Sequence, residues 1–335
     1  MKESRELISL ALAAALLFTP AAAQQPAPVE EVPIVGLAGI TFRVTDLEKA
    51  RRYYMGVLGL AEAFDLKDGA GKIASVFFKV NDDQYVEVTP NLEPGGVNRQ
   101  ARVVILSSDL PRLHRIYAGR GLNPGPITQG PDGNPVFRIE GPDNARLDFI
   151  QYVPGSRQTM ARGRFLSADR VSTHLWHVGI YTSDAASRTA FYEQKLGLAG
   201  GRDLPGGRSE FIETPRSDRN LETKHPPLDP ANPATRAQYE REVMGAVQHM
   251  ALEVTDMRAV RDRVQQRGRL TDLQVRAHVG NNRHWLMHLF DPDGSRTEVM
   301  ETAVQDTLPP MTVMAPGAAV APPILPKTPG VIPWP

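Results

Sequence analysis

The 335-residue sequence contains no cysteine, so the protein can form no disulfide and can offer no thiolate to a metal ion. An excess of charge of one sign is also missing, because 38 Lys and Arg residues balance 38 Asp and Glu residues. This balance gives no indication of a nucleic-acid partner or of an anionic membrane surface. Histidine is scarce, with 8 residues in the chain. Any metal site must therefore be built from His, Asp and Glu side chains.

The N-terminus has the features of a secretory signal. Lys2 and Arg5 precede the apolar run LISLALAAALLF, and Ala21 and Ala23 supply the small residues of a cleavage site. The apolar run is too short to span a bilayer comfortably. We therefore expect a secreted protein, or a periplasmic protein of a bacterium, with no stable membrane insertion after the signal is removed.

Between its two ends the chain repeats itself. The stretch VTDLEKARRYYMGVLGL (44–60) aligns without gaps on TSDAASRTAFYEQKLGL (182–198). In the same way, SSDLPRLHRIYAGRGL (107–122) resembles VTDMRAVRDRVQQRGRL (254–270). Each stretch is typical of a strand end, an N-capping Asp, an amphipathic helix and a Gly at the helix end. The repeats predict four units in the order A, B, A′, B′.

The stretches HVGIYTSD, QHMALEVTD and DPDGSRTE are the most specific. They resemble the vicinal oxygen chelate superfamily, which includes glyoxalases, bleomycin-resistance proteins and extradiol dioxygenases. The resemblance implies an α+β fold of four βαβββ modules. These would pair into two halves, each a curved mixed sheet around a cleft with helices outside. The expected division is a signal peptide at 1–23, a linker at 24–33, an N-terminal half at 34–153, a linker at 154–173, a C-terminal half at 174–303 and a Pro/Ala-rich tail at 304–335.

Two histidines occupy equivalent points of two units, because His177 and His249 stand at the same distance before the N-capping Asp. The resemblance places both on the cleft face, with Glu298 of the last strand beside them. It also puts Glu222 at a position that carries a ligand Glu in glyoxalase-like members. The predicted ligands of one divalent ion (Fe, Mn, Ni or Zn) are therefore His177, His249, Glu298 and Glu222.

The first half of the repeat is an internal control for this assignment. Gly39, Arg102 and Asp148 align with the two histidines and Glu298, and Glu87 aligns with Glu222. The fold itself therefore does not require imidazole at these positions. Gly39 offers no ligand atom, and the cation of Arg102 would oppose a metal ion. We expect the N-terminal half to have lost its site and to be structural.

A divalent ion with open positions would polarise two neighbouring oxygens of a small-molecule substrate. Glu222 is the candidate base, and the strand parity of His288 makes it a second candidate acid or base. Extradiol dioxygenases of the family carry Tyr at the position of His288 and a further His that His225 would match. Retention of Glu222 instead favours the glyoxalase-like ligand set.

The predicted function is an exported metal-dependent enzyme of this superfamily, acting on a small molecule with two vicinal oxygens. One alternative is an extradiol ring-cleaving dioxygenase that uses Fe(II). The other is a non-catalytic small-molecule binding protein of the bleomycin-resistance kind. The sequence leaves open whether the chain forms a homo-oligomer. It also leaves open whether residues 225–246 cover the cleft or only connect two strands.

Overall fold

The computed structural model describes residues 31–182, 185–203, 209–214, 217–224, 247–272, 274–280 and 283–304. The predicted signal peptide, Asp184, the segment that begins with His225, and the tail beyond residue 304 lie outside the described residues. Within the described ranges, no helix is both long enough and apolar enough to cross a membrane.

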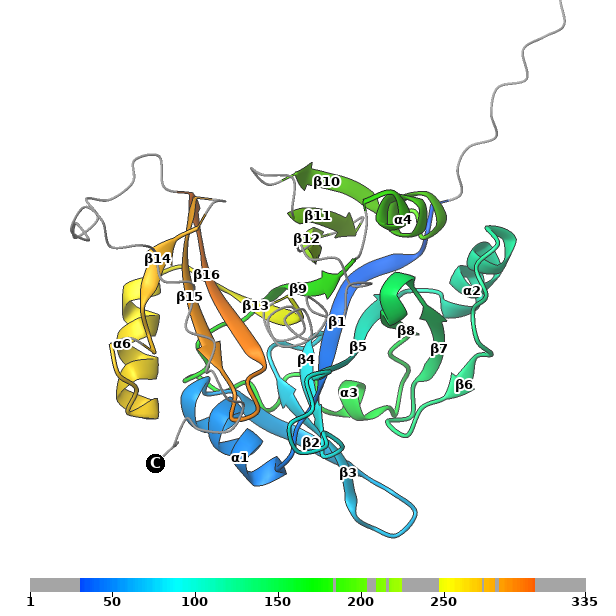
Figure 1. Ribbon diagram of the computed structural model, residues 1–335. Helices are drawn as coiled ribbons and strands as arrows, with labels where there is room; N and C mark the ends of the chain where they lie inside the picture. Colours follow the sequence, from blue (N-terminus) through cyan, green and yellow to red (C-terminus); the bar gives the residue numbers. More distant parts are fainter. Residues whose placement is uncertain are drawn as a thin grey trace, which may run out of the picture. The chain divides into compact units, whose positions relative to one another are not determined.

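The first half of the chain forms one mixed sheet of eight strands, in the order β2-β3-β4-β1-β5-β8-β7-β6 (Figure 1). The pairs β1–β4 and β5–β8 are parallel, and the other neighbours are antiparallel. The strands are β1 (Ile34–Arg43), β2 (Ala61–Lys67), β3 (Ile73–Lys79), β4 (Tyr85–Thr89), β5 (Gln100–Ser107), β6 (Thr128–Gln129), β7 (Pro135–Glu140) and β8 (Arg146–Ile150). The helices are α1 (Leu47–Arg51), the π-helix η1 (Arg52–Val57), α2 (Leu110–Gly119) and the short 3-10 helix η2 (Pro142–Asn144).

The second half repeats this arrangement in a sheet of the order β10-β11-β12-β9-β13-β16-β15-β14. Helix α3 (Arg157–Met160) precedes it in the connecting segment. The strands are β9 (Leu175–Tyr181), β10 (Ala199–Asp203), β11 (Ser209–Thr214), β12 (Ser217–Lys224), β13 (His249–Val254), β14 (Ala277–Val279), β15 (His284–Phe290) and β16 (Arg296–Val304). The helices are α4 (Ala185–Arg188), the π-helix η3 (Thr189–Lys195) and α6 (Met257–Gly268).

Each half consists of two βαβββ modules, which begin at β1 and β5 in the first half and at β9 and β13 in the second. The predicted α+β fold of paired modules is therefore confirmed. Strand register also confirms the alignment of the halves. Glu87 lies opposite Thr41 as Glu222 lies opposite Gly179. Asp148 of β8 lies opposite Val104, as Glu298 of β16 lies opposite Ala251.

Three of the four predicted N-capping aspartates begin their helices, and the fourth, Asp184, lies outside the described residues. Oδ1 of Asp46 accepts hydrogen bonds from the backbone N–H groups of Glu48 and Lys49 at the start of α1. Asp109 caps α2 and Asp256 caps α6 in the same way. These carboxylates satisfy backbone donors that have no partner within the helix.

The predicted glycine ends hold for three helices and are displaced at the fourth. Gly59, Gly121 and Gly197 have positive φ angles of 68°, 73° and 72°, which glycine adopts without a steric penalty. At α6 the aligned Gly268 is still helical, and Arg269 takes the left-handed conformation with φ of 48°. The left-handed residue at the end of α6 therefore lies one position later than the repeat predicts.

The buried apolar side chains form a core that continues from one half into the other, from Ile40 and Phe78 to Leu252 and Val299. The first half also makes polar contacts with the strands of the second. Tyr53 of η1 donates a hydrogen bond of 2.8 Å to Oγ1 of Thr297 in β16. The shared core and this hydrogen bond connect the first half to β16, the strand that carries Glu298.

Candidate metal centre

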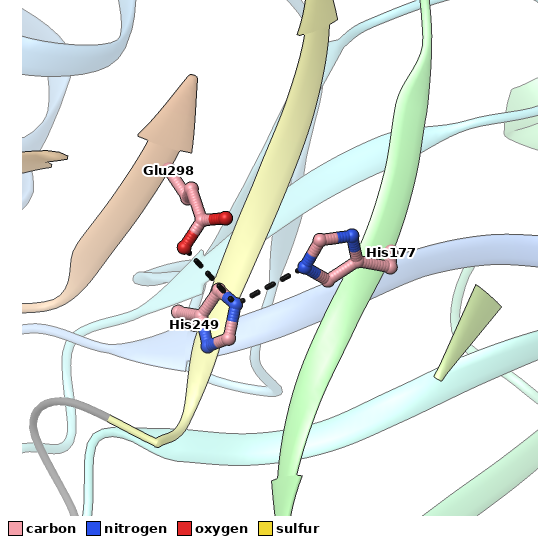
Figure 2. A group of neighbouring side chains, drawn as sticks. All are labelled: His177, His249 and Glu298. Atoms are coloured by element: carbon pink, nitrogen blue, oxygen red, sulfur yellow. Dashed lines mark hydrogen bonds and ion pairs between the residues drawn. The ribbon is translucent and has the colours of Figure 1, made fainter. Parts of the chain in front are cut away.

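Three adjacent strands bring the predicted ligands together (Figure 2). β13 lies between β9 and β16, and its Ala251 is opposite both His177 and Glu298. His249 precedes Ala251 by two residues and so shares its side of the strand. The pairing of β9 with β13 shifts register between Ala251 and Leu252, directly after the position opposite His177. His177, His249 and Glu298 consequently converge although they are far apart in sequence.

The converging atoms are close to one another and shielded from water. Nε2 of His177 lies 3.2 Å from Nε2 of His249, and Nε2 of His249 lies 3.8 Å from Oε2 of Glu298. Ligand atoms of all three residues lie within 4.8 Å of one another. Both histidines have 0% exposure and Glu298 has 5%. The group is therefore a compact buried cluster of nitrogen and oxygen donors.

Glu222 joins the same cluster from the opposite side of β9. Its strand β12 pairs with β9 in parallel, with Glu222 opposite Gly179. Oε2 of Glu222 lies 3.2 Å from Nε2 of His249 and 3.6 Å from Nε2 of His177. Glu222 is 4% exposed. Glu222 therefore contacts both imidazoles of the cluster with one carboxylate oxygen.

These separations fit a single transition-metal ion. Ligand atoms at about 2.1 Å from an ion lie about 3.0–3.4 Å from their neighbours in octahedral or tetrahedral arrangements. The contacts of 3.2, 3.2, 3.6 and 3.8 Å among the four donors are at or slightly above that range. Two buried carboxylates also need a compensating positive charge, which a divalent ion supplies. The residues present fit the metal that the resemblance implies.

A backbone contact prepares His249 for this role. Its Nδ1 lies 2.6 Å from the carbonyl oxygen of Val247. A carbonyl can only accept a hydrogen bond, so Nδ1 carries the proton and the lone pair of Nε2 faces the cluster. Gly179 leaves the space for this arrangement. A Cβ at Gly179 would lie 2.0 Å from the Val247 oxygen and 2.1 Å from Nδ1 of His249.

His288 lies at the edge of the cluster. It is opposite Glu298 across β15 and β16, and its Nε2 is 3.3 Å from Oε2 of Glu298. Burial alone would raise the pKa of the Glu298 carboxyl, but the neighbouring His288 and Arg296 hold that pKa well below its ordinary value. The low pKa favours the ionised carboxylate, which is the form that can bind a cation.

His174, His278 and His284 make other contacts. His174 pairs with Glu253, and Nδ1 of His284 donates to the carbonyl of Glu301. The ring of His278 meets that of His288 edge-on, with 5.3 Å between centroids. None of these three lies among the four converging donors. His225 lies outside the described residues.

The first half places an arginine where the second half has its donor cluster. The guanidinium of Arg102 contacts Glu87 and Asp148, the counterparts of Glu222 and Glu298. Its Nε lies 3.2 Å from Oδ2 of Asp148. An imidazole at position 39 is excluded, because a Cβ on Gly39 would lie 2.2 Å from the backbone oxygen of Tyr85. Arg102 therefore supplies positive charge to both carboxylates, and Arg138 pairs with Asp148 as well.

The site contains two features that the sequence reasoning did not anticipate. The first is Gly179, which leaves room for the His249 ring. The first half has Thr41 at the aligned position, and this difference was the available signal. The second is Arg296. It stands two residues before Glu298 on β16, so its side chain leaves the strand on the face of Glu298. The two-residue spacing on one strand could have indicated from the sequence that Arg296 lies near Glu298.

Comparison with known proteins agrees with the fold. Residues 174–299 match the family model of the Glyoxalase/Bleomycin resistance protein/Dioxygenase superfamily. The second half of the chain therefore carries a domain of this superfamily, and the resemblance inferred from its motifs is confirmed. No curated protein sequence matches the chain.

Solved structures extend the similarity of fold over both halves. A variant of homoprotocatechuate 2,3-dioxygenase from Brevibacterium fuscum is 18% identical with a TM-score of 0.58, covering 83% of this chain and 74% of that one. The Mn(II)-bound glyoxalase from Novosphingobium aromaticivorans is 15% identical with a TM-score of 0.57, covering 81% and 83%. A 2,3-dioxygenase from Pseudomonas sp. KL28 is 15% identical with a TM-score of 0.56, covering 81% and 93%.

Proposed function

We propose that the protein is a metal-dependent enzyme that acts on a small molecule with two vicinal oxygens. One divalent ion would be held by His177, His249, Glu298 and Glu222. The observation that carries this proposal is the convergence of two buried imidazoles and two buried carboxylates, with contacts of 3.2–3.8 Å to Nε2 of His249. Imidazole and carboxylate together suit iron, manganese, nickel and zinc.

When bound, such an ion acts as a Lewis acid on the neighbouring oxygens of the substrate. The chain's own residues would provide orientation and proton transfer. Val247 fixes the ring of His249 through Nδ1. Glu222 is the carboxylate that we assign as exchangeable ligand or base, and His288, at 3.3 Å from Glu298, is close enough to move a proton at its Nε2. Burial of the donors keeps bulk water away from the reacting atoms.

The reaction is either a proton transfer of the glyoxalase kind or a ring cleavage of the dioxygenase kind. The similarity to an Mn(II)-bound glyoxalase and the position of Glu222 within the donor set support the first. The similarity to homoprotocatechuate 2,3-dioxygenase supports the second, for which the ion would be Fe(II). His288 stands where the family resemblance implies Tyr in dioxygenases, which favours the first reaction. We also propose export, on the basis of the N-terminal signal alone.

Elemental analysis of the mature protein, purified without chelator, tests the metal proposal. We expect about one equivalent of a transition metal in the wild type and less than a tenth of that in a His249→Ala variant. His174→Ala is the matched control, because His174 pairs with Glu253 away from the donor cluster. It should keep the full metal content.

The identity of the bound metal and the metal content of the variants distinguish the proposed functions. Iron would direct assays toward catechols, and zinc, nickel or manganese toward isomerisation and elimination. Wild-type protein without metal, even after incubation with these ions, would contradict the proposal and favour the non-catalytic binding protein. Equal metal in the wild type and in His249→Ala would show that the ion lies elsewhere.

A further inference from the structure

A buried arginine lies beside the proposed metal centre. Arg296 is in β16 opposite His249 of β13, and it is 8% exposed. Its Nη2 lies 3.6 Å from Oε2 of Glu298, which is longer than a hydrogen bond. The position of Arg296 on β16 therefore places its guanidinium beside the four donor atoms, without a hydrogen bond to Glu298.

One edge of this guanidinium has no hydrogen-bond acceptor among the residues that the structure describes. Nε and Nη2 of Arg296 are both buried and donate no hydrogen bond to any residue that the structure describes. Buried polar groups are nearly always hydrogen-bonded, because an unmade hydrogen bond leaves the desolvation cost uncompensated. An acceptor group on a bound molecule would satisfy both of these N–H groups of Arg296.

Other arginines of this protein show what that edge binds. Arg138 uses Nε and Nη2 to hold the two oxygens of Asp148, at 2.6 and 2.9 Å. Arg51 uses the same two atoms to hold Glu62, at 2.8 and 3.0 Å. Two parallel N–H groups in one plane match the two oxygens of a carboxylate. The open edge of Arg296 has the same geometry.

The first half again offers a comparison. Arg146 of β8 is the counterpart of Arg296, since Asp148 is the counterpart of Glu298. The Arg146 side chain is 48% exposed and lies 3.6 Å from Glu140. An arginine at this position of the sheet can thus reach water. Of the two copies, Arg296 is the buried one, and its Nε and Nη2 donate no hydrogen bond to a described residue.

We infer that Arg296 binds a carboxylate group of the substrate while the vicinal oxygens of that substrate occupy the metal. The inference rests on the proposed function, and it narrows the substrate class to anionic molecules that carry a carboxylate near the chelating pair. Arg296 would then be a specificity-determining residue. Its charge also offsets that of Glu298, but this role uses neither the Nε–H group nor the bidentate geometry.

The test compares chelating probes with and without a carboxylate. Full-length mature protein is loaded with zinc, which has no redox chemistry, and its zinc content is measured first. Affinities for catechol, 2,3-dihydroxybenzoate and 3,4-dihydroxybenzoate are then measured by titration calorimetry. The variants are Arg296→Met, Arg296→Lys and the matched control Arg146→Met. The lysine variant keeps the charge at the site if the methionine variant fails to fold or to hold zinc.

We expect the wild type to bind at least one of the dihydroxybenzoates roughly tenfold more tightly than catechol. Arg296→Met and Arg296→Lys should lose most of that preference with little change in their affinity for catechol, whereas Arg146→Met should keep it. Equal affinities for all three probes in the wild type, or an undiminished preference in both Arg296 variants, would overturn the inference while the metal site stands. Failure of the wild type to hold zinc, manganese, nickel or iron would instead overturn the proposed function and this inference with it.

Discussion

At the scale of single residues, the site depends on what Gly179 lacks as much as on what its ligands contain. The ring of His249 and the carbonyl of Val247 occupy the space that a Cβ at residue 179 would fill. The same hydrogen bond from Nδ1 that fixes the ring leaves Nε2 as the donor. The absence of a Cβ at Gly179 therefore permits both the position of the His249 ring and the hydrogen bond that sets its tautomer.

A Gly179→Ala substitution should disable the site. The added Cβ would displace the His249 ring or the Val247 carbonyl, so we expect metal affinity to fall by roughly tenfold or more. The free energy of unfolding should fall by about 1–3 kcal/mol because of overpacking. Metal titration followed by elemental analysis measures the first effect, and urea unfolding measures the second.

Gly119→Ala is the matched control, because a Cβ at this position in α2 would meet no atom within 4 Å. It should keep wild-type metal affinity and gain slightly in stability, by up to about 1 kcal/mol. Wild-type metal affinity in Gly179→Ala would show that the site tolerates a side chain there.

At the scale of elements, the repeated helices share features that their sequences show only in part. The helices of modules A and A′ both pass into a π-helix, with hydrogen bonds of 3.1 Å from Leu58 to Tyr53 and 2.9 Å from Leu196 to Phe191. In the second repeat pair, α6 extends through Gly268 and leaves Arg269 in the left-handed region with φ of 48°. That conformation is costly for a residue with a Cβ.

Replacing Arg269 by glycine should stabilise the protein. Arg269 is exposed and has a positive φ, so Arg269→Gly relieves the steric cost at the end of α6. We expect a gain of about 0.5–1 kcal/mol in the free energy of unfolding, measured in urea. Arg263→Gly, at an exposed position within α6, should instead cost about 1 kcal/mol. A loss of stability in both variants would contradict this account of the helix end.

At the scale of the whole molecule, the donor cluster lies in the second half, and the first half makes structural contacts to it. The first half supports strands that carry the donors of the second. Gln84 exchanges hydrogen bonds of 2.8 and 2.9 Å with the backbone of Leu175 at the start of β9. Gln100 donates to the carbonyl of Gly179 at 3.1 Å, and Tyr53 donates to Thr297. The first half therefore has a structural role for which it needs no metal of its own.

Its own carboxylates are neutralised by Arg102 instead. Removing the guanidinium in Arg102→Met leaves the buried Glu87 without its arginine partner and leaves Asp148 with Arg138 alone, so stability should fall by about 2–4 kcal/mol. The metal content should stay at the wild-type level, because the donor cluster lies in the other sheet.

Unfolding in urea and elemental analysis of the same preparations measure the two effects. Arg146→Met removes a more exposed ion pair and should change stability by less than about 1 kcal/mol. An Arg102→Met protein as stable as the wild type would contradict the charge-compensation argument, and one without metal would contradict the separation of roles between the halves.

Local patterns determined much of this protein from the sequence alone. The N-capping aspartates, three of the four helix-end glycines and the alignment of the modules follow from backbone chemistry that acts within a few residues. The same alignment placed His177 and His249 at equivalent positions and singled out the missing imidazoles of the first half. For that reason the fold class and the candidate donors were predictable.

Only the tertiary structure decided how the donors meet and what surrounds them. The contact of Glu222 with both imidazoles depends on the register of β12 on β9, which hydrogen bonds between distant segments set. The need for Gly179 comes from the approach of Val247, and the open edge of Arg296 comes from its burial beside Glu298. Such properties arise when side chains from separate strands compete for one volume, and no stretch of sequence encodes that competition locally.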